Sequence, residues 1–240
     1  MHRILKKNLN ENGFNNGAKI LDVGCGNGDL VNLMRQNGYD AFGIDIEFKD
    51  GKHISTLLNQ GIIKKVEIGD KTRTTLRSGD QYAWPDFNIL FDVIVSRAVI
   101  EHVQNLEEFV NSSKSILKKG GICIHYFPSK YSIIEPHIGV PFGGVFTNKT
   151  WIKLMCLLGL CFRANRGNGE KAYLYMLNST AYRRQSEIDM LFKQGGFQRV
   201  KSIGPMQCHP KKIYNLIGRV PFMNKLFSIF RSRVIVYKLA

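Results

Sequence analysis

The sequence predicts an α/β protein with one domain, in which helices cover both faces of a mostly parallel sheet. Three observations lead to this prediction. Short apolar runs alternate with amphipathic helical segments, as in chains of strand–helix–strand units. A glycine-rich loop, residues 24–28, follows the first apolar run directly. Acidic residues then recur where later strand segments end. A chain of 240 residues can bury the core of one such domain.

The first half of the chain is expected to begin the sheet with two strands and their helices. Gly38 and Gly61 follow the two helical segments, where glycine commonly ends a helix. The stretch 62–77 is ambiguous, and we place the third strand inside it. The expected elements are strand Ala18–Val23, helix Leu30–Gln36, strand Tyr39–Ile46, helix Lys52–Gln60 and a strand within Thr72–Arg77.

The second half repeats the alternation around one long irregular segment, Pro128–Tyr182. We interpret this segment as an insertion after the fifth strand, because ordinary loops are much shorter. Lys118–Gly121 should end the preceding helix, with cations at its negative end. The expected elements are strand Phe91–Ser96, helix Leu106–Leu117, strand Ile122–Phe127, helix Gln185–Gln194, and strands Gln198–Ile203 and Arg233–Leu239.

Composition points to a basic protein inside the cell. The net charge is +15, and every charged residue after Asp189 is basic. Such a surface attracts phosphates of nucleic acid, anionic lipid or substrate. No run is long enough to span a membrane and no signal peptide is visible, so we expect a cytoplasmic protein. The five cysteines are scattered, which suggests neither disulfides nor a zinc site. The oligomeric state stays open.

The basic segment of about residues 205–232 also has apolar residues at helical spacing. Two interpretations remain open. The segment can lie on an anionic membrane surface, which would make the protein peripheral at the inner membrane face. It can equally pack on its own domain as an excursion between the last two strands.

The loop from Asp22 to Gly28 is the first candidate for a ligand site. Its glycines let backbone approach a ligand closely, and the helix behind it presents free N–H groups. A dinucleotide-binding loop needs a glycine where Asp29 stands, and an acid there would repel a pyrophosphate. This disfavours a nicotinamide dehydrogenase. Asp22 suits a ligand that carries an amino group.

Two further acids stand where a nucleoside would need them. Asp45 ends the second strand about 20 residues after the loop, the position from which an acid binds ribose hydroxyls. Asp80, in Ser78–Gln81, can accept a hydrogen bond from an adenine amino group. Asp70 is the alternative for this role, and spacing to Phe91 favours Asp80.

These motifs resemble class I S-adenosylmethionine-dependent methyltransferases of the ubiquinone-methylase-like group. The resemblance rests on ILDVGCGNG (Ile20–Gly28), GID (Gly43–Asp45), SGDQ (Ser78–Gln81), FDVIVSRAVIEHV (Phe91–Val103) and LKKGG (Leu117–Gly121). It implies a Rossmann-like seven-stranded sheet of order 3-2-1-4-5-7-6, with the seventh strand antiparallel.

The resemblance also implies roles for individual residues in binding S-adenosylmethionine. Asp22, Gly24, Cys25 and Gly26 would hold the methionine part, and Gly28 and Arg97 complete the predicted cofactor site. Asp45 and Ile46 would hold the ribose, and Asp80 and Gln81 the adenine.

Methyl transfer to a hydroxyl needs a base, and two histidines are candidates. Glu101 and His102 follow the fourth strand, and His137 follows the fifth, so all three lie at the ligand-binding edge. The sequence favours His137 and leaves His102 open, and Glu135 can either orient His137 or bind acceptor hydroxyls itself. Neither histidine has a partner at a metal-ligand spacing, so no metal is expected.

Residues 127–137 also resemble methyltransferases of bacterial surface-polysaccharide gene clusters. We therefore expect O-methylation of a sugar hydroxyl on a nucleotide- or lipid-linked glycan, with Pro128–Tyr182 as a cap over the acceptor. The alternatives are a quinone or another small molecule, an RNA, and a non-catalytic binding protein of the same fold. A nucleic acid partner is disfavoured because no RNA-binding module is visible.

Overall fold

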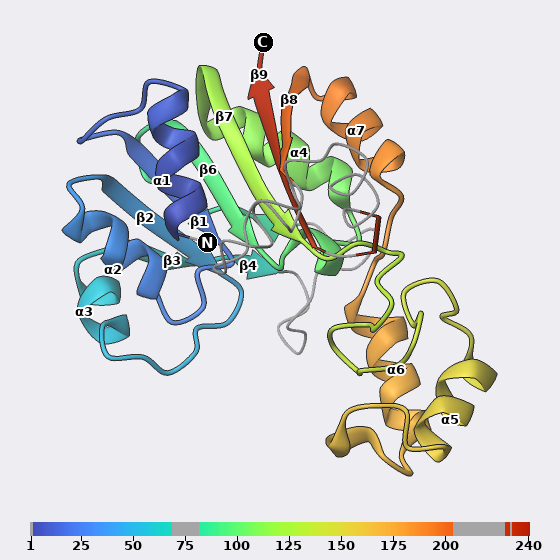
Figure 1. Ribbon diagram of the computed structural model, residues 1–240. Coiled ribbons are helices and arrows are strands. Elements are labelled where there is room, and N and C mark those ends of the chain that lie inside the picture. The colour runs from blue at the N-terminus through green and yellow to red at the C-terminus, as the bar shows by residue number, and fades with distance from the viewer. Residues whose placement is uncertain (1, 69–81, 204–228, 231) are drawn as a thin grey trace.

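The computed structural model describes residues 2–68, 82–203, 229–230 and 232–240 (Figure 1). Within them, seven strands form one sheet in the order β3-β2-β1-β6-β7-β9-β8. This is the predicted order, and β9 runs antiparallel to both of its neighbours. Strands β4 and β5 form a separate antiparallel pair.

The strands of the main sheet are β1 (Lys19–Val23), β2 (Asp40–Asp45), β3 (Ile63–Lys65), β6 (Phe91–Arg97), β7 (Leu117–Phe127), β8 (Phe197–Ile203) and β9 (Arg233–Leu239). The small pair consists of β4 (Glu67–Ile68) and β5 (Tyr82–Ala83). The helices are α1 (His2–Glu11), α2 (Asp29–Gln36), α3 (Ile54–Asn59), α4 (Leu106–Ile116), α5 (Lys149–Leu157), α6 (Gly169–Ser179) and α7 (Gln185–Gln194). Two short 3-10 turns are η1 (Ile100–His102) and η2 (Arg163–Asn165).

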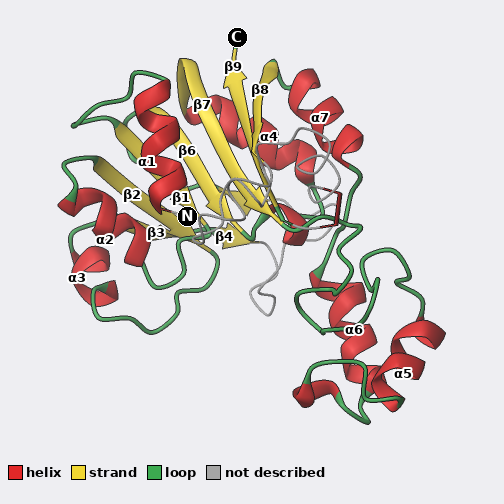
Figure 2. Ribbon diagram, viewed as in Figure 1, coloured by secondary structure: helices red, strands yellow, loops and turns green. Residues whose placement is uncertain are grey.

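Helices cover both faces of the sheet, as predicted (Figure 2). Successive residues of a strand point to opposite faces. In β1, Ile20 packs in the core beneath α1, α2 and α3, whereas Leu21 packs in the core beneath α4 and α7. The central strands are therefore buried on both sides, and only their ends remain for a binding site.

The predicted position of the third strand was wrong. The strand beside β2 is Ile63–Lys65, paired in parallel with Gly43–Asp45. Ile62, Ile63 and Val66 are buried, so this short segment supplies the apolar surface that the sheet edge needs. The predicted location, 72–77, lies outside the described residues.

Helix α1 was not predicted, because residues 1–16 look polar as a whole. Leu5 and Leu9 are four residues apart and fully buried against the sheet. Residues four apart lie on the same face of a helix, so these leucines place one face of α1 in the core. Glu11 at the end of this helix forms an ion pair with Lys201 of β8.

Lys118–Gly121 do not terminate a helix in the predicted way, because β7 begins at Leu117, directly after α4. The Nζ of Lys118 lies 2.7 Å from Oδ1 of Asp92. Pairing with β6 shifts register between Phe91 and Val93, and Gly120 has a φ of 76° there. The two lysines and two glycines thus build an irregular start to the strand.

The segment between β7 and α7 folds into a helical unit built on α5 and α6. Figure 1 shows it beyond the carboxyl ends of β6 and β7, away from the sheet. It has its own small core, which consists of Ile138, Val140, Ile152, Met155, Cys156, Ala172 and Met176. This unit lies at the edge where parallel strands present their ligands.

Among the described residues, no helix combines the length and apolarity required to cross a membrane. The basic segment predicted near 205–232 lies largely outside the described residues, since 204–228 and 231 are not among them.

Candidate functional site

A cavity of about 790 Å³ opens where β1, β2 and β6 end. This volume suits a nucleoside-sized ligand. The predicted site residues that line it are Asp22, Gly24, Cys25, Gly26, Asp45, Ile46, Arg97, His102 and His137. Gly28 and Glu101 do not line it, and Asp80, Gln81 and the alternative Asp70 lie outside the described residues.

The glycine loop is held against the cavity by close backbone packing. Gly24 has a φ of 76°, and a Cβ there would come within 2.3 Å of Cγ2 of Val99. Only glycine fits such a position. The amide of Gly26 donates to Oδ2 of Asp45 over 2.6 Å, which ties the loop to the end of β2.

Gly28 lies at the start of helix α2 and does not line the cavity. It caps the start of α2 with a φ of 75°. A Cβ there would lie 2.7 Å from Cδ1 of Leu57 in α3. Its lack of a side chain therefore lets α2 and α3 approach one another.

Asp22 is the most strongly perturbed acid at the cavity. It is 5% exposed, and burial together with the charge of Asp45 raises the pKa of its carboxyl to about 8. Arg97, at the end of β6, opposes this shift. A buried acid of this kind gains stability from a cation that enters the cavity.

An aromatic wall stands on the other side of the cavity. Trp84 and Phe109 both line it, and their rings meet edge to face with centroids 5.4 Å apart. Val66 adds an aliphatic surface beside them. Such a wall suits one flat ring of a ligand.

The two candidate histidines meet at the mouth of the cavity. The Nε2 atoms of His102 and His137 lie 3.1 Å apart, although the residues follow different strands. Nδ1 of His102 donates to the carbonyl oxygen of Ser179 in α6 over 2.5 Å. Burial lowers the pKa of His102, which favours its neutral form.

Glu135 orients His137, as the sequence suggested. Its Oε1 accepts from Nδ1 of His137 and from the hydroxyl of Tyr182, each over 2.6 Å. Its Oε2 accepts from the amides of His137 and Ile138. Burial opposes ionisation of His137, but the hydrogen bond and charge of Glu135 raise its pKa above the ordinary value.

Glu101 lies behind the histidine pair rather than in the cavity wall. Its side chain is buried, and neither carboxylate oxygen has a hydrogen-bond partner among the described residues. Burial raises the pKa of this carboxyl to about 7. The backbone carbonyl of Glu101 accepts from the amide of Ala181, which anchors η1 to the chain after α6.

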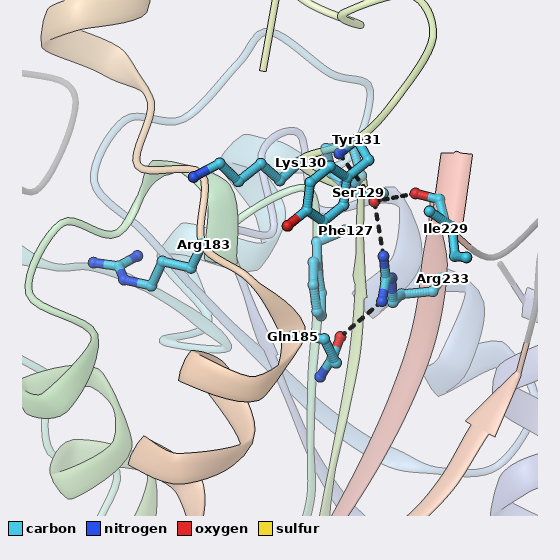
Figure 3. A pocket seen from close by; sticks show the side chains of 9 residues that line it. Phe127, Ser129, Lys130, Tyr131, Arg183, Gln185, Ile229 and Arg233 are labelled. Atoms are coloured by element: carbon cyan, nitrogen blue, oxygen red, sulfur yellow. Dashed lines mark hydrogen bonds between the residues drawn. The ribbon is translucent and has the colours of Figure 1, made fainter. Parts of the chain in front are cut away.

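A smaller cavity of about 100 Å³ lies where the chain leaves β7 (Figure 3). Arg233 of β9 reaches across it to Oγ of Ser129, over 2.7 Å, and to Oε1 of Gln185, over 3.3 Å. Ser129 in turn donates to the carbonyl oxygen of Ile229. These bonds attach the start of the α5–α6 segment to the last strand, so we interpret this cavity as a structural joint.

Several residues at the site were not found from the sequence. Lys49 and Phe109 line the main cavity without belonging to a recognisable motif, and Val99 lines it within the Phe91–Val103 motif without having been singled out. Tyr182 was considered only as the end of the insertion, yet its hydroxyl completes the support of His137. A hydroxyl 45 residues away in the chain leaves no local signal.

Comparison with known proteins places these observations in a family. The model of a methyltransferase domain family matches residues 1–201. Curated relatives are ubiquinone biosynthesis O-methyltransferases: that of Caulobacter vibrioides is 33% identical over 106 residues, 44% of this chain and 39% of the relative. That of Azoarcus is 33% identical over 105 residues, 44% of this chain and 42% of the relative. The matches thus span about two fifths of these relatives.

Solved structures agree with the fold across nearly the whole chain. An S-adenosylmethionine dependent methyltransferase from Mesorhizobium loti superposes with a TM-score of 0.51 at 14% identity, over 93% of this chain and 91% of that one. A phosphoethanolamine N-methyltransferase of Haemonchus contortus in complex with S-adenosyl-L-methionine gives 0.55 at 11%, over 100% and 52%. On the family match and the observed sheet, the chain belongs to the methyltransferase domain family and has the Rossmann-like fold of class I S-adenosylmethionine-dependent methyltransferases.

Proposed function

We propose that this methyltransferase transfers the methyl group of S-adenosylmethionine to a hydroxyl oxygen. The observation that carries the proposal is the histidine pair, which borders the same cavity as the glycine loop. A hydroxyl must lose its proton to accept a methyl group, whereas amines that are already neutral need no base. Two imidazoles beside the cofactor cavity supply that function.

The cavity fits S-adenosylmethionine, the cofactor that the sequence predicts and that this family assignment supports. The buried carboxyl of Asp22, whose pKa is raised by burial, suits the amino group of the methionine part. Asp45 would take the ribose, and Trp84 with Phe109 would take the adenine ring. When bound, the cofactor supplies a methyl group on a positively charged sulfur.

The protein's own residues would position the acceptor and accept its proton. Glu135 and Tyr182 fix His137 so that its Nε2 faces both the cavity and His102. A proton taken up by either Nε2 is shared with the other, because the two atoms lie 3.1 Å apart.

The α5–α6 unit is our candidate for the acceptor cap, within the segment Pro128–Tyr182. Tyr175 of α6 lines the cavity beside His137 and offers an aromatic face to a sugar or ring. Trp151 does not line the cavity, and its Nε1 donates to the carbonyl oxygen of Pro141 within the unit. Arg163, Arg166 and Lys171 are exposed and suit an acceptor phosphate.

A sugar hydroxyl on a nucleotide- or lipid-linked glycan is our first candidate acceptor. A lipid-linked form would explain a run of exposed apolar side chains at the end of α5 and in the loop after it. Exposed fractions there are 77% for Leu157, 59% for Leu158 and 50% for Leu160. Soluble proteins rarely expose adjoining leucines without a partner, and a membrane surface would cover them.

A phenolic hydroxyl of a quinone precursor is the second candidate. It is favoured by the aligned relatives, which are ubiquinone biosynthesis O-methyltransferases. The alignment covers only 44% of this chain, so it leaves the acceptor side open.

A methyl-transfer assay with both acceptor classes tests the proposal. Purified protein is incubated with S-adenosylmethionine labelled in its methyl group and with nucleotide sugars, lipid-linked sugars or catechol-type phenols. Methyl ethers should form with one class and disappear in His137→Ala. Methylation of an amine, with no ether from any acceptor, would contradict the proposal.

A further inference from the structure

Two imidazole rings in this site are held with their lone pairs facing each other. His102 donates its Nδ1 proton to Ser179, and His137 donates its own to Glu135. Each neutral ring therefore keeps a lone pair on Nε2, and these two nitrogens are 3.1 Å apart. Two lone pairs at this distance repel unless a cation lies between them or beside both.

A buried carboxylate completes the arrangement. Glu101 is 3% exposed, and both of its oxygens lack a hydrogen-bond partner among the described residues. A buried carboxylate without a partner is costly, so it also calls for a positive group. One oxygen of Glu101 and one nitrogen of each histidine all lie within 4.8 Å of one another.

We infer that Glu101, His102 and His137 bind one divalent metal ion of the zinc class. Two imidazole nitrogens and a carboxylate form a ligand set of catalytic zinc sites, which leave a fourth position open. Nitrogens on one tetrahedral zinc ion lie roughly 3.3 Å apart, given Zn–N bonds of about 2.0–2.1 Å. The observed 3.1 Å is close to that spacing, and an oxygen of Glu101 lies within 4.8 Å of a nitrogen of each histidine.

The surroundings of the histidines support this ligand role. A metal-binding histidine almost always donates its other ring N–H to a carboxylate or a carbonyl, which fixes the ring. His137 has the carboxylate of Glu135 and His102 has the carbonyl of Ser179. Nitrogen ligands favour zinc, cobalt or nickel over magnesium and calcium, which prefer sets made of oxygen.

The inference rests on the proposed function for the role of the ion and changes one step of it: histidines whose Nε2 atoms bind the ion are not free to act as the base, and the ion takes over the activation of the hydroxyl. Both histidines border the cofactor cavity, so an acceptor hydroxyl can reach the open position. The ion makes that hydroxyl more acidic. Its proton then leaves to solvent, an O–C bond forms, and the C–S bond breaks with its electron pair on sulfur. The charges balance because the sulfonium becomes a neutral thioether.

The test is metal binding by the full chain after chelator treatment. The stripped protein is titrated with Co²⁺, whose visible absorption reports its ligands, and then with competing Zn²⁺. One Co²⁺ per chain should bind and be displaced by Zn²⁺. Glu101→Gln, His102→Gln and His137→Gln should each weaken binding at least about 100-fold, since the neighbours of metal ligands alone contribute about 10–100-fold.

Two further variants distinguish loss of the metal site from unfolding and from metal binding by other histidines. Tyr182→Phe removes only a supporting hydroxyl, so the protein should fold and bind Co²⁺ about 10–100-fold more weakly. His53→Gln, a histidine outside the cavity lining, should bind as the wild type does. Absence of binding to the wild type, or equal binding by the Glu101 and His137 variants, would overturn the inference.

Calorimetry with S-adenosylhomocysteine on the same samples keeps the two proposals apart. If the cofactor product binds and Co²⁺ does not, the metal inference fails and the methyltransferase proposal stands. If S-adenosylhomocysteine does not bind to folded protein, the proposed function fails whatever the metal result.

Discussion

The Nε2 atoms of His102 and His137 lie 3.1 Å apart and join the chain that follows β6 to the chain that follows β7. Ser179 in α6 and Glu135 hold the two rings in this orientation. The α5–α6 unit is therefore bonded to the catalytic edge through the residues that we expect to activate the acceptor.

Loss of the His137 ring should affect turnover and leave cofactor binding intact. His137→Ala is expected to lower the turnover number about 10²–10⁴-fold, the usual contribution of an activating group of this kind. The affinity for S-adenosylhomocysteine should change little, because His137 stands at the mouth of the cavity. His53→Ala serves as the control and should retain full turnover. If cofactor affinity falls while turnover stays normal, His137 contributes to cofactor binding and does not activate the acceptor.

Asp45 should be required for cofactor affinity. Its Oδ2 accepts from the amide of Gly26 over 2.6 Å and its Oδ1 accepts from the amide of Glu47. Asp45→Ala should weaken S-adenosylhomocysteine binding by about 1.5–3 kcal/mol, through lost bonds to ribose hydroxyls. Calorimetry measures the affinity, and urea unfolding shows how much of the change comes from the loop. Unchanged affinity would contradict the assignment.

Asp22 should make the cofactor-free protein less stable as the pH rises. The native carboxyl has a pKa of about 8, whereas the unfolded chain releases this proton near pH 4. Between these values the unfolded state binds fewer protons, so the free energy of unfolding falls with pH, by at most about 1.4 kcal/mol per unit. Asp22→Asn removes this contribution.

Urea unfolding of both proteins at pH 5 and pH 7.5 checks this expectation. The wild type should lose more stability between the two values than Asp22→Asn does. The variant should also bind S-adenosylhomocysteine more weakly, because it cannot become a carboxylate beside the amino group. Parallel pH dependences would show that Asp22 does not titrate in this window.

Gly24 should tolerate no side chain, because a Cβ there would clash with Val99. Gly13, which has nearly the same φ but open space around it, separates this clash from backbone strain. Gly24 and Gly13 have φ values of 76° and 78°, but a Cβ at Gly13 would meet nothing within 4 Å. Gly13→Ala should cost roughly 1–2 kcal/mol, the strain of a left-handed backbone. Gly24→Ala should cost roughly 1–3 kcal/mol more, because its Cβ meets Val99. Equal costs in urea unfolding would exclude the steric explanation.

The exposed leucines after α5 should bind to anionic membranes if the acceptor is lipid-linked. Leu157→Ser with Leu158→Ser should reduce cosedimentation with phosphatidylglycerol vesicles at least about tenfold, since each inserted leucine contributes roughly 1–2 kcal/mol. Leu90→Ser is the control, because Leu90 is 50% exposed but precedes β6 at the opposite edge of the sheet. An equal effect of both changes would indicate non-specific adhesion.

The sequence alone determined the sheet and the cofactor side of the site. Segments such as Ile20–Val23 and Phe91–Val95 are local signals, because a strand buried on both faces is mostly apolar, here with one aspartate in each. The glycine loop and Asp45 are also local, since each stands directly at the end of a strand. These features predicted the strands and a ligand site at their carboxyl ends, and the resemblance to class I methyltransferases implied the order of the sheet.

Only the tertiary structure located the third strand, the first helix and the histidine pair, because none of them has a clear local signal in the sequence. The third strand, Ile63–Lys65, has three residues, too few for a periodic pattern, and its place depends on the exposed edge of β2. The first helix packs on the sheet through Leu5 and Leu9, two apolar residues in a polar stretch. The approach of the nitrogens of His102 and His137, from which we infer a metal site, arises through folding and leaves no signal in spacing along the chain. This contact depends on how the chain after β6 packs against the chain after β7, so it forms only when the protein folds.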